Sequence, residues 1–172
     1  MTSLDALFRE FNQPLVRYLT RRLGDRDWAE EVAQETFLRA ARQKEIINER
    51  SWLFAVATNL VRDEARKDAR RRRHLELLAH EERERQDTVP QVVAMESAEQ
   101  ARLARQALEA LTERDREALL MREEGLDYNE IAAALELSVA SVGTTLARAR
   151  KRLVEAFEAQ QRSGSGRKNA AS

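Results

Sequence analysis

The segment from Asp127 to Leu153 constrains this chain more than any other, because its pattern predicts two helices around a tight turn. The first helix ends near Glu136, and the second begins after Ser138, which is a favourable N-cap residue. Up to Leu153 the second helix has no acidic residue and carries the basic residues Arg148, Arg150, Lys151 and Arg152. This layout is typical of a helix-turn-helix, whose second helix enters the major groove of duplex DNA.

The second helix divides into an apolar arc and a polar arc when successive residues are placed about 100° apart. The apolar arc contains Val139, Val142, Leu146, Ala149 and Leu153. The polar arc, here called the recognition face, contains Ser141, Thr144, Thr145, Arg148, Lys151 and Arg152. Arginine can read guanine or hold a phosphate, and short hydroxyls allow a close approach to base edges. The alternative is an ordinary helical hairpin with a solvated basic face.

Composition limits the classes of protein that remain possible. The 172 residues include only 5 Gly and 2 Pro, which predicts an all-α protein. The 30 basic and 30 acidic residues cancel, so only the distribution of charge can attract nucleic acid. The chain has no cysteine, and its histidines, His74 and His80, point to different sides of a helix. We therefore expect that the chain is not an enzyme and binds neither a metal ion nor a cofactor.

Neither a signal-like N-terminus nor an apolar stretch long enough to span a bilayer is present, so we expect a cytoplasmic protein with no direct membrane contact. The order of patterns predicts two small helical domains joined by a flexible linker. The expected helices of the first domain, residues 1–85, run from Asp5 to Leu23, from Asp27 to Arg42, and onward from an N-cap at Ser51. Acidic composition and Pro90 mark the linker at residues 86–98. The second domain, residues 99–158, contains the helix-turn-helix, and residues 159–172 form a tail that we expect to be disordered.

The helix that starts near Ser51 also has two unlike sides. Its apolar arc contains Leu53, Phe54, Ala57, Leu60 and Val61. Its opposite side contains Trp52, Val56, Asn59, Asp63, Arg66 and Arg70, and a track of basic residues begins at Arg62. The candidate DNA-binding residues of this helix are here called the single-strand face: Trp52, Asn59, Arg62, Asp63, Arg66 and Arg70. A basic track beside an exposed aromatic ring suits single-stranded or distorted DNA, because cations follow the backbone while the ring stacks on bases. The alternative for this segment alone is a solvated charged helix.

The preceding helix has the opposite chemistry. Its expected buried side contains Ala29, Val32, Ala33, Thr36 and Ala40. Its exposed side, here called the docking face, contains Glu31, Gln34, Glu35 and Leu38. An acidic surface with an exposed leucine is a poor DNA surface and a plausible protein-docking surface. The alternative is an ordinary polar helix face.

Three of these segments, in order, resemble one family, the extracytoplasmic-function (group four) sigma factors of bacterial RNA polymerase. Residues 29–37 resemble the start of sigma region two, residues 51–63 resemble the promoter-melting helix, and residues 128–153 resemble region four. The resemblance spans residues 4–157. It implies a factor that binds core RNA polymerase and directs transcription from specific promoters.

The resemblance also implies a role for each surface. The docking face would bind the clamp helices of the polymerase β′ subunit, and the β flap would be a second contact. The loop at residues 43–50 would capture a flipped minus-ten base, and the single-strand face would border the melted strand. The recognition face would contact the minus-thirty-five duplex. An anti-sigma factor that binds both domains is a further possible partner.

The chain departs from the family pattern at Glu136, Gly143, Thr145 and Ala147. These departures leave open which DNA sequence the chain recognises at the minus-thirty-five element. Glu136 stands where glycine is usual, because the turn requires a left-handed conformation. Two other functions remain as alternatives. One is a stand-alone helix-turn-helix regulator that does not associate with polymerase core, and the other is a helical adaptor that mimics a sigma domain.

Overall fold

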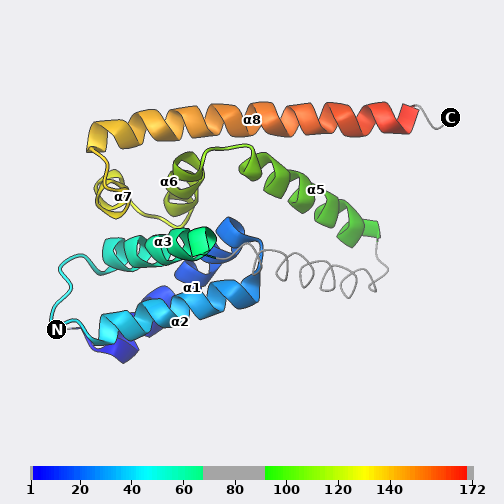
Figure 1. Cartoon of the computed structure of the whole chain (residues 1–172). Coiled ribbons are helices and arrows are strands. Elements are labelled where there is room, and N and C mark those ends of the chain that lie inside the picture. Colours follow the sequence, from blue (N-terminus) through cyan, green and yellow to red (C-terminus); the bar gives the residue numbers. More distant parts are fainter. Residues whose placement is uncertain (1, 68–91, 170–172) are drawn as a thin grey trace.

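The computed structural model describes residues 2–67 and 92–169, and in these ranges it contains helices and no strand (Figure 1). The N-terminal domain consists of α1 (Leu4–Leu23), α2 (Arg26–Ala41) and α3 (Glu49–Lys67). The C-terminal domain consists of α5 (Val92–Glu109), α6 (Glu113–Glu123), α7 (Tyr128–Leu135) and α8 (Val139–Asn169). The prediction of an all-α chain with two helical domains is confirmed.

Local capping sets the boundaries of the first two helices. Ser3 begins α1 by accepting the backbone N–H of Ala6 at 3.1 Å, and Gly24 ends it with a left-handed φ of 73°. Asp25 then begins α2 by accepting the N–H of Trp28 at 3.0 Å. The buried residues of α2 include the whole expected set, so this face was predicted correctly: Ala29, Val32, Ala33, Thr36 and Ala40.

The start of α3 differs from the expectation. The helix begins at Glu49, and the side chain of Asn48 accepts the N–H of Ser51 at 3.2 Å, so Ser51 is not the N-cap. Ser51 is buried instead, and its hydroxyl donates to the carbonyl oxygen of Glu130 at 2.7 Å. The partner lies 79 positions away in the sequence, which is why local pattern alone could not identify it.

The helix-turn-helix is confirmed. Asp127 and Glu130 form a capping box at the start of α7, with hydrogen bonds of 2.8 and 3.1 Å. Glu136 ends α7 with a left-handed φ of 55°, as the turn requires. Ser138 accepts the N–H of Ser141 at 3.2 Å and so begins α8. The two helices meet at 96°, within the range of this motif.

Two expected boundaries differ from the helices. The helix α5 begins at Val92, inside the expected linker, and the rest of that linker lies outside the described residues. The helix α8 continues to Asn169 and so includes residues 159–169 of the tail expected to be disordered, while residues 170–172 lie outside the described residues. α8 packs along α5, and with its amide oriented to donate, Gln160 bonds the carbonyl oxygen of Leu103 at 2.8 Å. Packing between helices therefore extends α8 beyond what its Ser and Gly content suggests.

The two domains are in direct contact. α1 contacts α6, and α3 contacts α7, so that α6 and α7 lie between the N-terminal domain and α8 (Figure 1). The buried apolar residues of both domains form one connected cluster. This packing brings Arg62 of the single-strand face into contact with Glu117 of α6.

Candidate nucleic-acid and polymerase interfaces

The recognition face is exposed at most of its expected positions. Ser141, Thr144, Arg148, Lys151 and Arg152 are exposed on α8. The prediction that Thr145 belongs to the exposed recognition face is wrong, because this residue is only 4% exposed. It lies three residues after Val142 and four before Ala149, both fully buried, and this spacing places it on the same side of the helix.

The apolar arc of α8 shifts accordingly. Val142, Leu146 and Ala149 are buried and Leu153 is half-buried, as expected. Val139 differs from the prediction because it is 46% exposed at the first turn of the helix. The core of the motif therefore begins one turn later than the sequence pattern indicated.

Arg148 makes a structural contact that the sequence did not reveal. Its Nε and Nη2 donate to the two carboxylate oxygens of Asp115 at 3.0 and 2.7 Å. Arg152 adds a longer ion pair to Asp115, at 3.8 Å. The Asp115 side chain is fully buried, and the hydrogen bonds from Arg148 hold its pKa below the usual value despite burial. Asp115 thus fixes how the recognition helix presents Arg148, whose side chain remains 46% exposed.

The single-strand face is partly exposed. Asn59 and Asp63 are exposed on α3. The prediction of an exposed Trp52 is wrong, because its side chain is half-buried and packs against the core. Trp52 lies between the buried Ser51 and the buried Leu53 at the start of the helix. The side chain of Arg66 and the whole of Arg70 lie outside the described residues.

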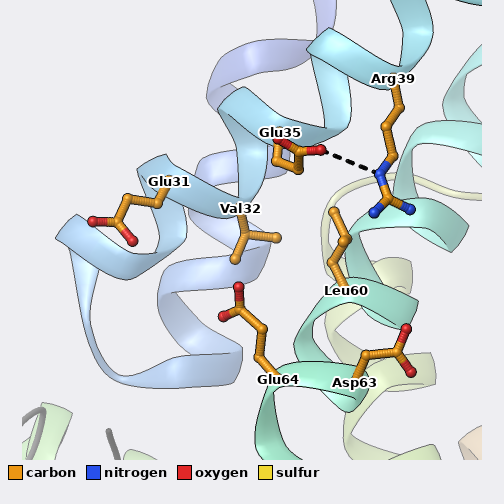
Figure 2. Close-up of a pocket in the computed structure, with 7 residues that line it drawn as sticks. All are labelled: Glu31, Val32, Glu35, Arg39, Leu60, Asp63 and Glu64. Atoms are coloured by element: carbon orange, nitrogen blue, oxygen red, sulfur yellow. Dashed lines mark hydrogen bonds and ion pairs between the residues drawn. The ribbon is translucent and has the colours of Figure 1, made fainter. Parts of the chain in front are cut away.

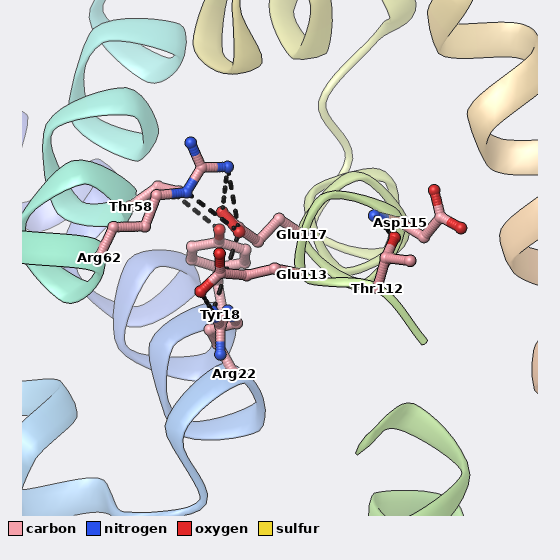
Figure 3. Close-up of polar contacts among 8 residues, drawn as sticks. All are labelled: Tyr18, Arg22, Thr58, Arg62, Thr112, Glu113, Asp115 and Glu117. Carbon is pink, nitrogen blue, oxygen red and sulfur yellow. Dashed lines mark hydrogen bonds and ion pairs between the residues drawn. The ribbon is translucent and has the colours of Figure 1, made fainter. Parts of the chain in front are cut away.

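Arg62 is covered by the C-terminal domain. Its Nε and Nη2 lie 3.3 and 3.1 Å from Oε1 of Glu117, and Nη2 lies 3.0 Å from Oε2. Figure 3 shows Arg62 of α3 and Arg22 of α1 converging on α6 from one side, where Arg22 donates to Glu113 at 2.6 Å. Asp115 points to the opposite side of α6 (Figure 3).

The Glu117 carboxylate is fully buried between the domains. Burial raises the pKa of Glu117, and it outweighs the nearby Arg62 and Arg22, which act in the opposite direction. The hydroxyls of Tyr18 and Thr58 share a hydrogen bond of 2.7 Å in the same region. Burial, with the Glu117 charge, also raises the pKa of Tyr18, which keeps this phenol neutral.

Further ion pairs join the two domains. Arg50 lies in the first turn of α3, at the end of the segment 43–50 that was expected to be a loop, and makes two hydrogen bonds of 2.8 Å to the carboxylate of Glu130. The hydrogen bond to Glu130 raises the pKa of Arg50. Arg17 lies 3.1 Å and Arg21 3.7 Å from the carboxylate of Glu124. Sequence patterns could not predict these contacts, because the paired residues are far apart in the chain. Arg50 and Glu130 are 80 positions apart, and Arg17 and Glu124 are 107 positions apart.

The docking face lies beside a small hollow between α2 and α3 (Figure 2). Glu31, Gln34 and Leu38 are exposed, Leu38 at 52%, while Glu35 is half-buried and pairs with Arg39 at 3.4 Å. The hollow has a volume of about 420 Å³ and is lined by Glu31, Val32, Glu35, Arg39, Leu60, Asp63 and Glu64. Leu60, expected in the core, is half-buried at its wall. The arrangement offers acidic groups around an apolar floor, which suits a basic protein surface.

The described residues contain no cluster of three or more His, Asp or Glu side chains arranged to hold a metal ion. In the same ranges no single helix is long and apolar enough to cross a membrane, and only the bent pair of α7 and α8 meets that test by length and composition.

Two family models match the chain in the order expected. The model described as Sigma-70 region 2 matches residues 7–71, and the model described as Sigma-70, region 4 matches residues 101–153. The first match covers the docking and single-strand faces, and the second covers the helix-turn-helix.

Individual proteins agree with the family models. The ECF RNA polymerase sigma factor SigL of Mycobacterium tuberculosis is 46% identical over 66 residues, a match that spans 36% of this chain and 37% of SigL. RNA polymerase sigma factor YlaC of Bacillus subtilis is 30% identical over 157 residues, covering 88% of this chain and 90% of YlaC. The solved structure of the sigma factor RpoE in complex with the anti-sigma factor NepR, from Bartonella quintana, superposes with a TM-score of 0.60 at 20% identity, covering 87% of this chain and 95% of that chain. The chain belongs to the extracytoplasmic-function, or group four, sigma factors of bacterial RNA polymerase.

Proposed function

We propose that this chain binds core RNA polymerase through its docking face and directs it to promoters by contacting two separate DNA elements. The observation that carries the proposal is the presence of three chemically distinct surfaces in one chain. These are the acidic docking face on α2, the single-strand face on α3 and the basic recognition face on α8. A stand-alone regulator would need the last of these and has no use for the first two.

The recognition face meets the minus-thirty-five element as duplex. Ser141 and Thr144 lie near the start of α8, where short side chains can approach base edges. Arg148, oriented by Asp115, reads a base, and Lys151 and Arg152 hold phosphates. Thr145 has no direct part in this contact because it is buried.

The N-terminal domain holds bases that leave the duplex at the minus-ten element. Asn59, Arg62 and Asp63 border the melted strand, with Arg66 and Arg70 continuing the basic track. The loop at residues 43–50 captures a flipped base, and its Ile47 is 97% exposed. Unstacking a base costs a few kcal/mol, which pocket contacts and polymerase binding offset.

The docking face binds the β′ clamp helices, and the C-terminal domain contacts the β flap. Leu38 provides an apolar anchor, and Glu31 and Glu35 provide charge complementarity to a basic surface. A cytoplasmic location follows from these partners. An anti-sigma factor is a further partner, since RpoE of Bartonella quintana was solved with NepR and CnrH with the cytosolic domain of CnrY.

Run-off transcription with purified core polymerase and a promoter library tests the proposal. We expect transcripts that depend on this chain and that share a minus-ten and a minus-thirty-five element. Co-purification with core polymerase tests the docking step separately. A chain that binds duplex DNA but neither co-purifies with core nor supports transcription would be a stand-alone regulator, and the proposal would be wrong.

A further inference from the structure

The carboxylates that join the two domains occupy arginines of the N-terminal domain. We propose that the closed arrangement is an autoinhibited state, in which Glu130 and Glu117 compete with the melted minus-ten strand for Arg50 and Arg62. The inference rests on the proposed function, which assigns Arg62 to the melted strand and places Arg50, in the first turn of α3, at the end of the base-capturing segment 43–50. Opening of the domains and binding of single-stranded DNA are then one coupled equilibrium.

The geometry of the contacts resembles the way arginine holds a phosphate. Arg50 binds both oxygens of Glu130 at 2.8 Å, and Arg62 binds both oxygens of Glu117 at 3.0 to 3.3 Å. Guanidinium groups bind carboxylate and phosphate in the same two-point manner, so one occupant excludes the other. The C-terminal domain thus presents carboxylates where the promoter strand would present phosphates.

In the described ion pairs between the domains, the positive and the negative partners always come from the same respective domain. Every arginine belongs to the N-terminal domain and every carboxylate to the C-terminal domain. The arginines are Arg17, Arg21, Arg22, Arg50 and Arg62, and the carboxylates are Glu113, Glu117, Glu124 and Glu130. In these described pairs the C-terminal domain therefore presents only carboxylates to the N-terminal domain, although the whole chain has zero net charge.

The pair of Arg50 and Glu130 contributes most to closure. Glu117 is fully buried, and the desolvation that raises its pKa offsets much of its attraction to Arg62. Arg50 is 36% exposed and Glu130 10% exposed, so this pair loses less hydration. The hydroxyl of Ser51 adds a neutral hydrogen bond of 2.7 Å to the Glu130 carbonyl oxygen. Glu130 and Ser51 are therefore the positions at which to test closure.

The absence of cysteine allows a clean distance measurement on the full chain. Gln13→Cys on α1 and Glu155→Cys on α8 introduce two exposed labelling sites, one in each domain. Glu130→Gln removes the charge but keeps the capping box, since glutamine also accepts the N–H of Asp127. Ser51→Ala removes only the neutral contact. Glu99→Gln is the matched control, because it breaks a 2.6 Å pair with Arg102 inside α5.

We expect Glu130→Gln and Ser51→Ala to increase the open population, Glu130→Gln by about tenfold or more, as loss of a charge-assisted hydrogen bond predicts. Added salt should open the unmodified protein and have a smaller effect on Glu130→Gln. Affinity for a fluorescent single-stranded DNA of random sequence should rise by the same factor as the open population, because the coupling is reciprocal. The control should match the parent chain.

A Glu130→Gln distance distribution identical to that of the parent would overturn the inference, and so would opening without a gain in affinity for single-stranded DNA. If Glu130→Gln does not fold, Ser51→Ala decides the matter by the same measurements. The distance measurement requires neither polymerase nor a promoter. Failure of the parent chain in run-off transcription would therefore reject the proposed function separately from closure.

Discussion

Asp115 at the start of α6 holds Arg148 of the recognition helix by both carboxylate oxygens, at 2.7 and 3.0 Å. Asp115 is also placed by its own helix start, since its backbone N–H donates to Thr112 at 3.2 Å. One residue therefore links the N-cap of α6 to a DNA-facing side chain of α8. The direction in which Arg148 points is set by the fold rather than by the recognition helix alone.

We expect Asp115→Asn to lower both stability and promoter use. The loss of a hydrogen bond from a charged group should reduce the free energy of unfolding by about 1.5–3 kcal/mol, measured by urea denaturation. Run-off transcription from a promoter with a minus-thirty-five element should fall as it does for Arg148→Ala, for which about a tenfold loss is expected. Arg162→Ala, on the exposed end of α8, is the matched control. Normal transcription by Asp115→Asn would show that Asp115 does not position Arg148.

The two buried acids of α6 should give opposite pH dependences. Because the folded-state pKa of Asp115 is depressed, its stabilising contribution is present above its ordinary pKa of 3.8 and is lost as the pH falls through the folded value. Because the folded-state pKa of Glu117 is raised, its contribution is present below 4.5 and is lost as the pH rises through the folded value. Urea denaturation of Asp115→Asn and Glu117→Gln across the acidic to neutral range measures how the free energy of unfolding changes with pH, and so gives the slope that each acid contributes. Each variant should abolish one of them; equal slopes in Glu117→Gln and the parent would contradict the raised pKa.

The turn of the helix-turn-helix can be made more stable. Glu136 has a φ of 55°, where glycine lacks the steric cost of a Cβ, so Glu136→Gly should raise the free energy of unfolding by about 1 kcal/mol. Gly143→Ala should add about 0.5–1 kcal/mol through helix propensity. The new methyl would lie 3.7 Å from Cε2 of Tyr128, an ordinary contact. Urea denaturation tests both, and a lower stability of Gly143→Ala would mean that Tyr128 cannot accommodate the methyl group.

Leu38→Asp should weaken binding to core polymerase without unfolding the protein. Leu38 is 52% exposed on α2, so an aspartate there remains solvated in the free chain. An apolar anchor at a protein interface contributes about 1–2 kcal/mol or more, so the loss of affinity should be at least about fivefold. Leu4→Asp is the matched control, because Leu4 is 44% exposed on α1 and belongs to none of the three faces. Equal affinities of the two variants for core would remove α2 from the docking surface.

The sequence determined the features that depend on residues near one another. The buried face of α2, the left-handed ends at Gly24 and Glu136, and the cap at Ser138 all follow from local spacing and local hydrogen bonds. The family resemblance followed from the same short segments, since each is contiguous. These features needed no knowledge of how the domains pack.

Only the tertiary structure decided which polar residues are free. The sequence predicts a helix cap at Ser51 and a DNA contact at Arg62, yet Ser51 is bound by Glu130 and Arg62 by Glu117, both of the other domain. Thr145 was placed on the recognition face and is buried. Helical periodicity gives the angle of a side chain about its own axis, but not what packs against that side. Contacts between distant residues depend on long-range packing, and this is why closure of the two domains could be seen only in the folded chain.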